Sequence, residues 1–513
     1  MLMGAALAWD DDHCEVIIGP GGGKGTHLVN RIRGSKPKRG QVRVGVPDRA
    51  LTRNAGLAVV SELCGRLGVI EAIDEAAGPV KERARGFGAG ELLTGIAAAQ
   101  LAGEDFLTGL DRQRADAAGQ QLTPVPGLSS TTAAGLARRI TPAQWLAVEN
   151  GVAAVTGRML GLLPAQRAGA LAEGPVTIDL DATDVEVYGR KKRGVAYNHQ
   201  GQRAGRPHVA VWAETEIALA ADLGSGTDDV RATAPGLLRR ALAALPAAVR
   251  GSGRVALRAD AGYFAGALAR AARDEHIAFA IGARRIAPLW RLLDGVADGD
   301  WRDAIGMEHA QVAVAGYCPD WWPVSTKLLI RRVALDAQQV SEDPRSRRGR
   351  TLHPGQRALP FPELAAEPAI YAYSFILTSL DVSTPDKAVA AEHWYRHRTT
   401  VENVFRDGKH GAALRHLPSG HHRVNMAWMW GALLAANMAG WLHQLTGVIQ
   451  GDDVVAGHGV RGGKAMIATL RWRLIAIPAR LIRHAGQRIL RLPAGHSLLP
   501  EILARLRALP IPA

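Results

Sequence analysis

The feature that most constrains the fold is the order of apolar segments between residues 176 and 283. Three segments with strand character come first, then a helical segment, and then a strand, a helix and a strand. They span residues 176–189, 206–214, 217–224, 232–249, 254–260, 264–276 and 277–283. Three consecutive strands followed by alternating helices and strands predict a mixed sheet covered by helices.

This order is typical of a ribonuclease-H-like sheet. Strand character resumes at 371–379, after a segment rich in Trp and Arg at about 286–365, and the apolar spacing is helical from about residue 50 to 160. The predicted fold class is therefore α/β: a ribonuclease-H-like mixed sheet with an inserted β-rich segment, preceded by an all-helical N-terminal region.

Charge and composition narrow the class of partner. The 513 residues carry a formal net charge of +14, which favours polyanions, and nucleic acid is the leading candidate. A hydrophobic content of 47% without a long charge-free apolar run predicts a globular protein that does not enter a membrane. No secretory signal is recognised at the start, so a cytoplasmic location is expected. The three cysteines lack metal-ligand spacing.

Acidic residues occur at the ends of two predicted strands. Alternation puts Asp179 and Asp181 on the same side of the first strand, and Asp260 ends the strand that begins at residue 254. A buried carboxylate without a counter-charge costs several kcal/mol. Mg²⁺ prefers such oxygen ligands, and two ions can activate an attacking oxygen and stabilise a leaving one.

The stretch from Tyr395 to Gly411, YRHRTTVENVFRDGKHG, is predicted to be one helix. At about 100° per residue, Tyr395, Arg398, Glu402 and Lys409 fall within about 60° of one another. An aromatic hydroxyl, a guanidinium, a carboxylate and an ammonium on one face suit a phosphodiester substrate.

The spacing of these four residues resembles the Tyr-Arg-Glu-Lys signature of bacterial insertion-sequence transposases of the DDE type. Asp181 in DLDAT and Asp260 in RADAGYF are similar to the first and second acidic residues of that family. The resemblance implies that Asp181, Asp260 and Glu402 are the catalytic residues and the ligands of two Mg²⁺ or Mn²⁺ ions. Asp179 and Asp184 flank Asp181, which is preferred because the family's acid stands one or two residues before a Thr.

The same resemblance implies a function. A DNA transposase of this kind binds terminal inverted repeats, cleaves the DNA ends with metal-activated water and joins the 3′-OH ends to target DNA. A homodimer acting on double-stranded DNA in the bacterial cytoplasm, associated with the nucleoid, is expected. The residues expected to contact DNA are Tyr395, Arg398, Lys409, Arg190, Lys191, Lys192 and Arg193.

Changes in composition and periodicity predict six parts of the chain. They are a basic flexible arm (1–45), a helical DNA-binding region (46–165), the first part of the catalytic domain (170–285), an insertion subdomain (286–365), the second part of the catalytic domain (366–445) and a C-terminal region (446–513). The segment 129–155 fits either a helix-turn-helix module or a plain helical bundle.

Three alternatives stay open. A ribonuclease-H-like nuclease or resolvase would share the acidic triad, and an inactive DNA-binding relic would share the basic surface. The tryptophans of the inserted segment fit a core role, or one of them stacks on a base extruded near the cut end. They are Trp290, Trp301, Trp321 and Trp322.

Overall fold

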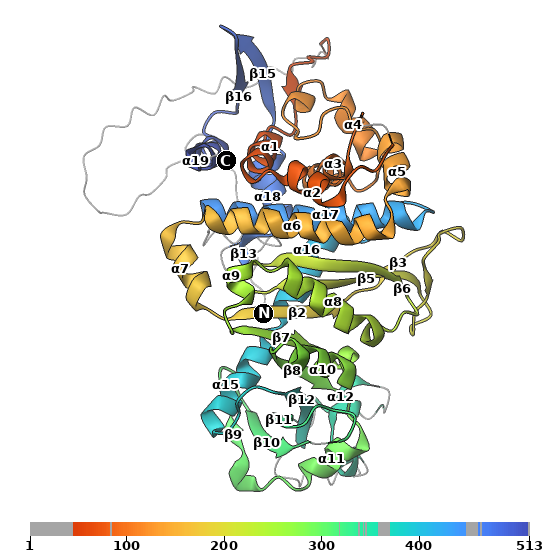
Figure 1. Ribbon diagram of the computed structural model, residues 1–513, viewed down its shortest axis with the longest axis vertical. Helices are drawn as coiled ribbons and strands as arrows, with labels where there is room; N and C mark the ends of the chain where they lie inside the picture. The colour runs from red at the N-terminus through yellow and green to blue at the C-terminus, as the bar shows by residue number, and fades with distance from the viewer. Residues whose placement is uncertain are drawn as a thin grey trace, which may run out of the picture. The chain divides into compact units, whose positions relative to one another are not determined.

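The computed structural model describes residues 45–82, 85–317, 319–336, 339–341, 343, 346–357, 370–447, 460–461 and 464–510. The chain divides into two units, Met1–Asp48 and Arg49–Ala513, and the architecture below is that of the second unit (Figure 1). The basic arm predicted for residues 1–45 lies outside the described residues, apart from its last residue. Within the described ranges, no helix combines the length and the apolar character needed to span a bilayer.

The centre of this unit is a mixed sheet. Its strand order is β6-β5-β2-β7-β8, where β5 is antiparallel to both β6 and β2, and β7 and β8 run parallel to β2. The strands are β2 (Val176–Ala182), β5 (Arg203–Trp212), β6 (Ile217–Ser225), β7 (Val255–Ala259) and β8 (Ala278–Ala283). Three antiparallel strands followed by two parallel ones confirm the predicted ribonuclease-H-like sheet.

Four further antiparallel strands continue this sheet beyond β8. They are β12 (Ile370–Thr378), β11 (Lys327–Leu335), β10 (Ala310–Gly316) and β9 (Arg302–Asp303), in that order. At the other end, β3 (Val185–Glu186) and β4 (Ala196–Tyr197) pair with the start of β5. The strands of the inserted segment therefore extend the central sheet instead of forming a separate one.

Helices pack on the sheet through alanine- and leucine-rich faces. The helices α8 (Val230–Ala244) and α10 (Gly266–Asp274) contact each other and the central strands, while α17 (His422–Thr446) contacts β6. Trp428, Trp430 and Trp441 of α17 are fully buried. Burial of aromatic area on this scale makes α17 a main contributor to the core.

The N-terminal region is helical, as its periodicity indicates, and α3 packs against α17. Its helices are α1 (Leu57–Leu67), α2 (Val69–Ala77), α3 (Ala89–Leu101), α4 (Gly109–Ala115), α5 (Ser130–Arg139), α6 (Pro142–Gly161) and α7 (Ala165–Glu173). The helix α6 begins at a Thr141 cap and buries Val148, Val152 and Val155 against α2 and α8. This packing favours the helical bundle over a projecting helix-turn-helix for residues 129–155.

The prediction of one helix from Tyr395 to Gly411 is wrong. The helix α15 (Pro385–Arg396) ends before His397, and α16 (Thr399–Gly411) begins after Arg398. The N–H groups of His397 and Arg398 donate to carbonyls three residues earlier, those of Trp394 and Tyr395, and such bonds tighten and end the last turn of a helix. The angular relation expected on a continuous helix does not hold, and Glu402 lies in the first turn of a new helix.

The C-terminal region combines short strands with one longer helix. Its elements are β13 (Val460–Arg461), β14 (Lys464–Ala465), α18 (Ile467–Leu470), the π-helical turn η5 (Arg471–Ile475), β15 (Ala479–His484), β16 (Gln487–Arg491) and α19 (Leu498–Ala508). The strand β1 (Leu51–Thr52) pairs with β15, so the two ends of this unit share a small sheet.

The remaining elements are short connections. They are η1 (Gly119–Gln121), α9 (Ala247–Arg250), η2 (Ala261–Tyr263), α11 (Ala287–Leu293), η3 (Asp298–Asp300), α12 (Arg347–Thr351) and α13 (Pro354–Arg357). Among them η2 matters for the site, because it follows Asp260 at the end of β7.

Candidate active site

The first acidic residue lies at the end of the central strand β2. Asp181 accepts a hydrogen bond at Oδ1 from the backbone N–H of Ala182 (2.8 Å). Its other oxygen, Oδ2, lies 3.8 Å from Nη1 of Arg398. The side chain is 17% exposed, so a carboxylate oxygen remains accessible at the carboxyl end of β2.

Asp179 is held in a different environment. Its carboxylate is fully buried and accepts two hydrogen bonds from Arg258, from Nε at 2.7 Å and from Nη2 at 2.8 Å. The two residues are direct neighbours on the parallel strands β2 and β7. A bidentate pair of this kind uses both carboxylate oxygens, which leaves Asp179 poorly suited to bind anything else.

The second acidic residue, Asp260, directly follows β7. Its Oδ1 accepts a hydrogen bond from the backbone N–H of Gly262 (2.7 Å) and caps the short turn η2. The hydroxyl of Tyr395 donates to the carbonyl of Ala259 at 3.2 Å, immediately before Asp260. Tyr395 thus braces the strand end that carries the second acid.

The third acidic residue enters from α16. Glu402 lies in the first turn of that helix, where the positive end of the helix dipole favours a carboxylate. Its Oε1 lies 3.8 Å from Nη2 of Arg398, and its side chain is 58% exposed. Glu402 is therefore the acid most open to solvent.

Arg398 is the residue that connects the three acids. It interacts electrostatically with Asp181, Asp260 and Glu402, and its side chain is only 15% exposed. Its Nη1 is buried and has no hydrogen-bond partner among the residues that the structure describes. A buried guanidinium with an unused donor group is suited to bind an oxyanion.

The ionisation of Asp181 depends on its surroundings. Burial raises the pKa of the Asp181 carboxyl to about 7; Arg398 opposes this shift, while the carboxylates of Asp260 and Glu402 add to it. A cation beside Asp181 would favour the charged form of this carboxyl and so offset the effect of burial.

Lys409 lies near the other end of α16, and its ammonium group faces the end of β2. Nζ donates to Oγ1 of Thr183 at 2.6 Å and to the carbonyl oxygen of Asp184 at 2.9 Å. Burial lowers the pKa of Lys409. The side chain fixes the segment that follows Asp181, and its predicted contact with DNA stays a prediction.

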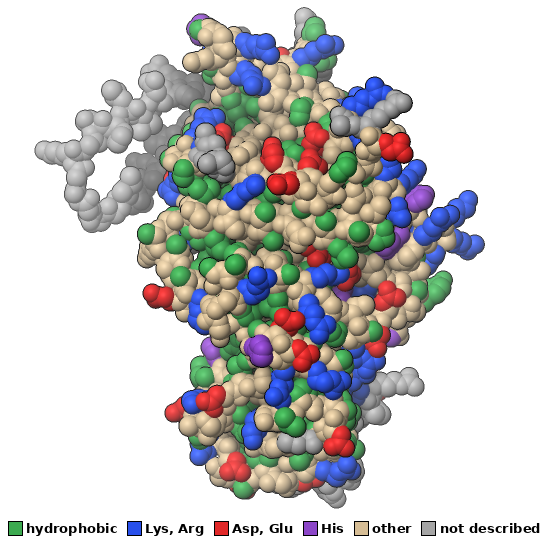
Figure 2. Space-filling model, viewed as in Figure 1, with side chains coloured by type: hydrophobic (Ala, Val, Ile, Leu, Met, Phe, Trp, Pro, Cys, Tyr) green, Lys and Arg blue, Asp and Glu red, His purple; other side chains and the backbone are tan. Residues whose placement is uncertain are grey.

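The basic loop between β3 and β4 contains the other residues predicted to bind DNA. Arg190, Lys191 and Arg193 are exposed, whereas Lys192 is half-buried and donates to the carbonyl of Leu417. Figure 2 shows Lys and Arg side chains gathered at the edge of the molecule where this loop lies.

One residue near the acids was not predicted from the sequence. Tyr263, in η2, is 1% exposed, and in the described part of the chain its hydroxyl has no hydrogen-bond partner. Burial, together with Asp181 and Asp260, raises its pKa well above the usual range. The motif RADAGYF contains this tyrosine, but nothing in the local sequence indicates that its hydroxyl is near the first acid.

The tryptophans of the inserted segment have two different environments. Trp290, Trp301 and Trp322 are buried, whereas Trp321 is 44% exposed. The Trp321 ring stacks on Trp322 (5.5 Å between centroids) and meets Phe264 edge to face at 5.3 Å. Phe264 lies four residues after Asp260, so these contacts join Trp321 to the segment that follows the second acid.

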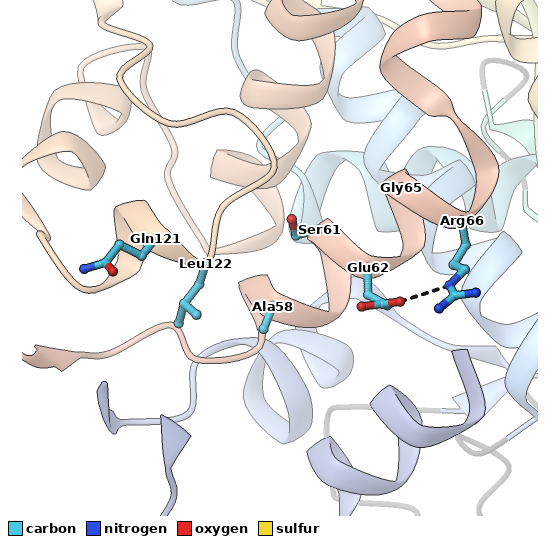
Figure 3. Close-up of a pocket in the computed structure, with 7 residues that line it drawn as sticks. All are labelled: Ala58, Ser61, Glu62, Gly65, Arg66, Gln121 and Leu122. Atoms are coloured by element: carbon cyan, nitrogen blue, oxygen red, sulfur yellow. Dashed lines mark hydrogen bonds and ion pairs between the residues drawn. The ribbon is translucent and has the colours of Figure 1, made fainter. Parts of the chain in front are cut away.

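A different part of the described surface contains an open hollow. This open pocket, with a volume of about 360 Å³, is lined by residues of α1 and η1, including Glu62 and Arg66, which form an ion pair (Figure 3). None of the candidate catalytic acids lines it.

The three acids are spread too widely to form a complete metal site as they stand. Within the part of the chain that the structure describes, no group of three His, Cys, Asp or Glu side chains is close enough to form a complete cage. The chemistry of the donor set fits a divalent cation nonetheless, since three carboxylates from three elements face the single guanidinium of Arg398. The three carboxylates would have to move closer together for all of them to bind one ion.

A mixed sheet of this order, with acidic residues at the carboxyl ends of β2 and β7, is typical of a class of enzymes that act on phosphodiesters. The family model described as "Transposase DDE domain" matches residues 172–438. The chain belongs to this transposase family, whose members are DNA transposases that generally use divalent metal ions.

Two other comparisons were made with known proteins. None of the curated proteins matches this chain. Among solved structures, the cryo-EM structure of a piggyBac transposase synaptic complex with hairpin DNA is similar at 11% sequence identity and a TM-score of 0.38, over 82% of this chain and 80% of that chain.

Proposed function

We propose that this chain is the transposase of a bacterial insertion sequence, which cuts the ends of its element and joins them to target DNA. The observation that carries the proposal is the convergence of Asp181, Asp260 and Glu402 on Arg398 at the carboxyl ends of β2 and β7. In the proposed reaction, water breaks the P–O3′ bond at the element end, and the freed 3′-OH then attacks a target phosphodiester and releases a target 3′-OH.

The side chains around the acids divide into two groups. Arg398 is proposed to bind the phosphate being attacked, because its buried Nη1 has no partner and its charge complements the developing oxyanion. Tyr395 and Lys409 hold the ends of β7 and β2 through backbone and hydroxyl contacts. The four residues of the Tyr-Arg-Glu-Lys pattern thus act as two positioning residues, one phosphate ligand and one metal ligand.

Asp181, Asp260 and Glu402 are the proposed ligands of two Mg²⁺ or Mn²⁺ ions. When bound, these ions would activate the attacking oxygen and stabilise the leaving oxygen. The free oxygen of Asp260 and the exposed carboxylate of Glu402 are accessible for this role, and Tyr263 is proposed to donate its unused hydroxyl to a phosphate or water beside Asp181.

DNA is proposed to approach along the basic loop of residues 190–193. Three of its four side chains are exposed, and the loop is attached to the main body because the N–H of Arg193 donates to the carbonyl of Gly420 (3.0 Å). Counterion release from such a loop supplies affinity without sequence preference. Recognition of a particular terminal-repeat sequence requires additional contacts between the protein and the base edges.

The proposed working form is a homodimer that holds two DNA ends, because both ends must be joined in one event. Light scattering of the protein with and without end DNA measures this directly. A monomer that completes strand transfer of both ends would exclude the dimer.

The experiment that tests the proposal uses purified protein, Mg²⁺ and a labelled duplex that carries the inverted repeat flanking the gene together with some adjoining DNA. Wild-type protein is expected to cut at the repeat boundary and to join the cut end to a plasmid, whereas Asp260→Asn does neither. Cutting without joining would favour a nuclease or resolvase. Binding without cutting would favour an inactive relic.

A further inference from the structure

The C-terminal hairpin formed by β15 and β16 has no role in the site described above. Its turn consists of Ala485 (φ 49°) and Gly486 (φ 77°), two positive φ values that are typical of a tight two-residue hairpin turn. Its base is fixed to β1, where Thr52 pairs with Ala479 and the N–H of Leu481 donates to the carbonyl of Ala50. Figure 1 shows the two strands extending beyond the neighbouring helices.

The segment containing this hairpin is basic throughout. Between Asp453 and Glu501 the sequence has no acidic residue, whereas it has eight Lys or Arg residues. Four of them lie in the two strands: Arg480, Arg483, Arg488 and Arg491. Figure 2 shows Lys and Arg side chains at this end of the molecule as well.

The strand register places these arginines opposite one another. Arg480 pairs with Arg491, and Arg483 pairs with Arg488. Because side chains alternate along a strand, the first pair points to one side of the hairpin and the second pair to the other. Like charges directly opposite each other destabilise an antiparallel pair, so this arrangement is unfavourable for the isolated protein.

The tip arginines also lack the partners that other exposed arginines have. Arg231 pairs with Asp229, and Arg239 pairs with Glu275. In the described residues, neither Arg483 nor Arg488 forms an ion pair with a carboxylate; Arg488 makes one long contact with the carbonyl of Gln121 (3.4 Å). Arg483 and Arg488 therefore present positive charge on one side of the hairpin, and Arg491, which is exposed, presents it on the other side.

We propose that the β15–β16 hairpin is an accessory DNA-binding element that enters the major groove of duplex DNA. The major groove is about 12 Å wide, admits a two-stranded ribbon and is bordered by phosphates on both sides. Arginines on opposite sides of the hairpin can contact the phosphates on both sides of the groove. A flat anionic surface could contact the arginines on only one side of the hairpin. The proposal rests on the proposed function in one respect, that duplex DNA is the substrate.

The test measures equilibrium binding of the full-length protein to two labelled duplexes, one of random sequence and one carrying the element end, over a series of NaCl concentrations. Arg483→Gln/Arg488→Gln is expected to reduce the slope of log K against log[salt] by about 1.8, and Arg491→Gln by about 0.9, since each lost phosphate contact removes about 0.9. Affinity should fall roughly tenfold or more for the double variant, and equally for both duplexes, because backbone contacts carry no sequence information.

The matched control is Arg239→Gln/Lys387→Gln, which removes the same charge at two exposed sites that have carboxylate partners. It should bind like wild type. The melting temperature of the hairpin variants should not fall, because their side chains are exposed and the change removes repulsion between arginines.

Several results would overturn the hairpin proposal. If Arg483→Gln/Arg488→Gln changes neither the affinity for DNA nor its salt dependence, the hairpin proposal is wrong. The proposed transposase activity would still be supported if the wild type cleaves end DNA and Asp260→Asn does not. An effect of the double variant without an effect of Arg491→Gln would exclude insertion into a groove, and a loss confined to one duplex would exclude backbone contact. A wild-type protein without any affinity for duplex DNA would overturn both proposals.

Discussion

The Nζ atom of Lys409 lies 2.6 Å from the hydroxyl of Thr183, two residues beyond Asp181. This contact ties the last turn of α16 to the end of β2, across 226 residues of sequence. The same helix carries Glu402 in its first turn. The contact therefore fixes the first and third acids relative to each other, which gives Lys409 a positioning role that a helical-face argument does not predict.

The first prediction concerns this contact. Lys409→Met should lower both the cleavage rate and the free energy of unfolding, the latter by about 1–3 kcal/mol, because a charged donor to two oxygens is lost. Thr183→Val should have a smaller effect in the same direction, and a double-mutant cycle should show coupling of about 1 kcal/mol. The measurements are chemical denaturation and cleavage of end DNA.

Lys387→Met is the control for this experiment, since Lys387 pairs with Asp381 on the surface. It should leave stability almost unchanged. Additive effects of Lys409→Met and Thr183→Val would contradict the positioning role. They would instead favour the predicted contact of Lys409 with DNA.

The second prediction is that Arg398 competes with divalent cations for the three acids. Arg398→Ala should raise the melting temperature gained on adding MgCl₂ above the gain of the wild type, because the carboxylates lose their internal cation. Cleavage should fall by about 10²-fold, the size expected when one stabilising donor is removed. Equal Mg²⁺ effects on wild type and variant would show that Arg398 does not occupy the cation site.

The acids at the strand ends could be predicted from sequence because their positions are local properties. A strand of the length of β2 places Asp179 and Asp181 on one side by alternation alone. Which of them is free could not be predicted, since the answer depends on Arg258, which is 79 residues away and opposite Asp179 on β7. Parallel pairing brought the two together, and no local pattern encodes that register.

The face of the predicted helix shows the limit of periodicity. Arithmetic on a continuous helix grouped Tyr395 with Arg398, Glu402 and Lys409, but the chain turns at His397 and Arg398. Tyr395 then reaches β7 and Lys409 reaches β2, so the residues converge on the site through tertiary contacts. The spacing alone therefore did not predict how these residues come together, because their arrangement depends on contacts with β7 and β2.

The third prediction separates Asp179 from Asp181. Asp179→Asn should destabilise the protein by about 3–5 kcal/mol, since it leaves the buried Arg258 without its counter-charge. Asp181→Asn should abolish cleavage while the melting temperature stays equal or rises, because burial disfavours the charged form of Asp181. The measurements are thermal unfolding and cleavage of end DNA.

Asp179→Asn/Arg258→Met serves as the control, because it removes both charges of the buried pair. Its stability should recover in part. A stable Asp179→Asn variant that cannot cleave, together with an active Asp181→Asn variant, would move the first catalytic acid to Asp179.

The fourth prediction concerns pH and Glu149, a buried residue of α6 that accepts from the N–H of Ala221 and lies 3.3 Å from Arg240. Burial raises its pKa from 4.5 to about 7, although Arg240 and the Ala221 N–H oppose the shift. Because the folded state binds this proton more tightly than the unfolded state, stability falls as pH rises from about 4.5 to 7. The contribution is at most about 3 kcal/mol.

Glu149→Gln should remove this part of the pH dependence and be more stable than wild type at pH near 8, with little difference at pH near 4.5. Asp181 changes stability in the same direction, so the quantity to compare is the difference between wild type and variant at each pH. A difference that does not change with pH would show that Glu149 is ionised throughout this range in the folded protein.

The fifth prediction concerns the role of Trp321, the exposed tryptophan of the inserted segment. Trp321→Ala should slow cleavage of end DNA with little loss of duplex affinity, because a ring that stacks on an extruded base acts after binding. Trp321→Phe should retain most of the rate, since it preserves the aromatic face. Trp472→Ala, at another exposed tryptophan (62%), is the matched control and should leave cleavage unchanged. If Trp321→Ala cleaves like wild type, Trp321 only covers Trp322 and Phe264, with which its ring is in contact.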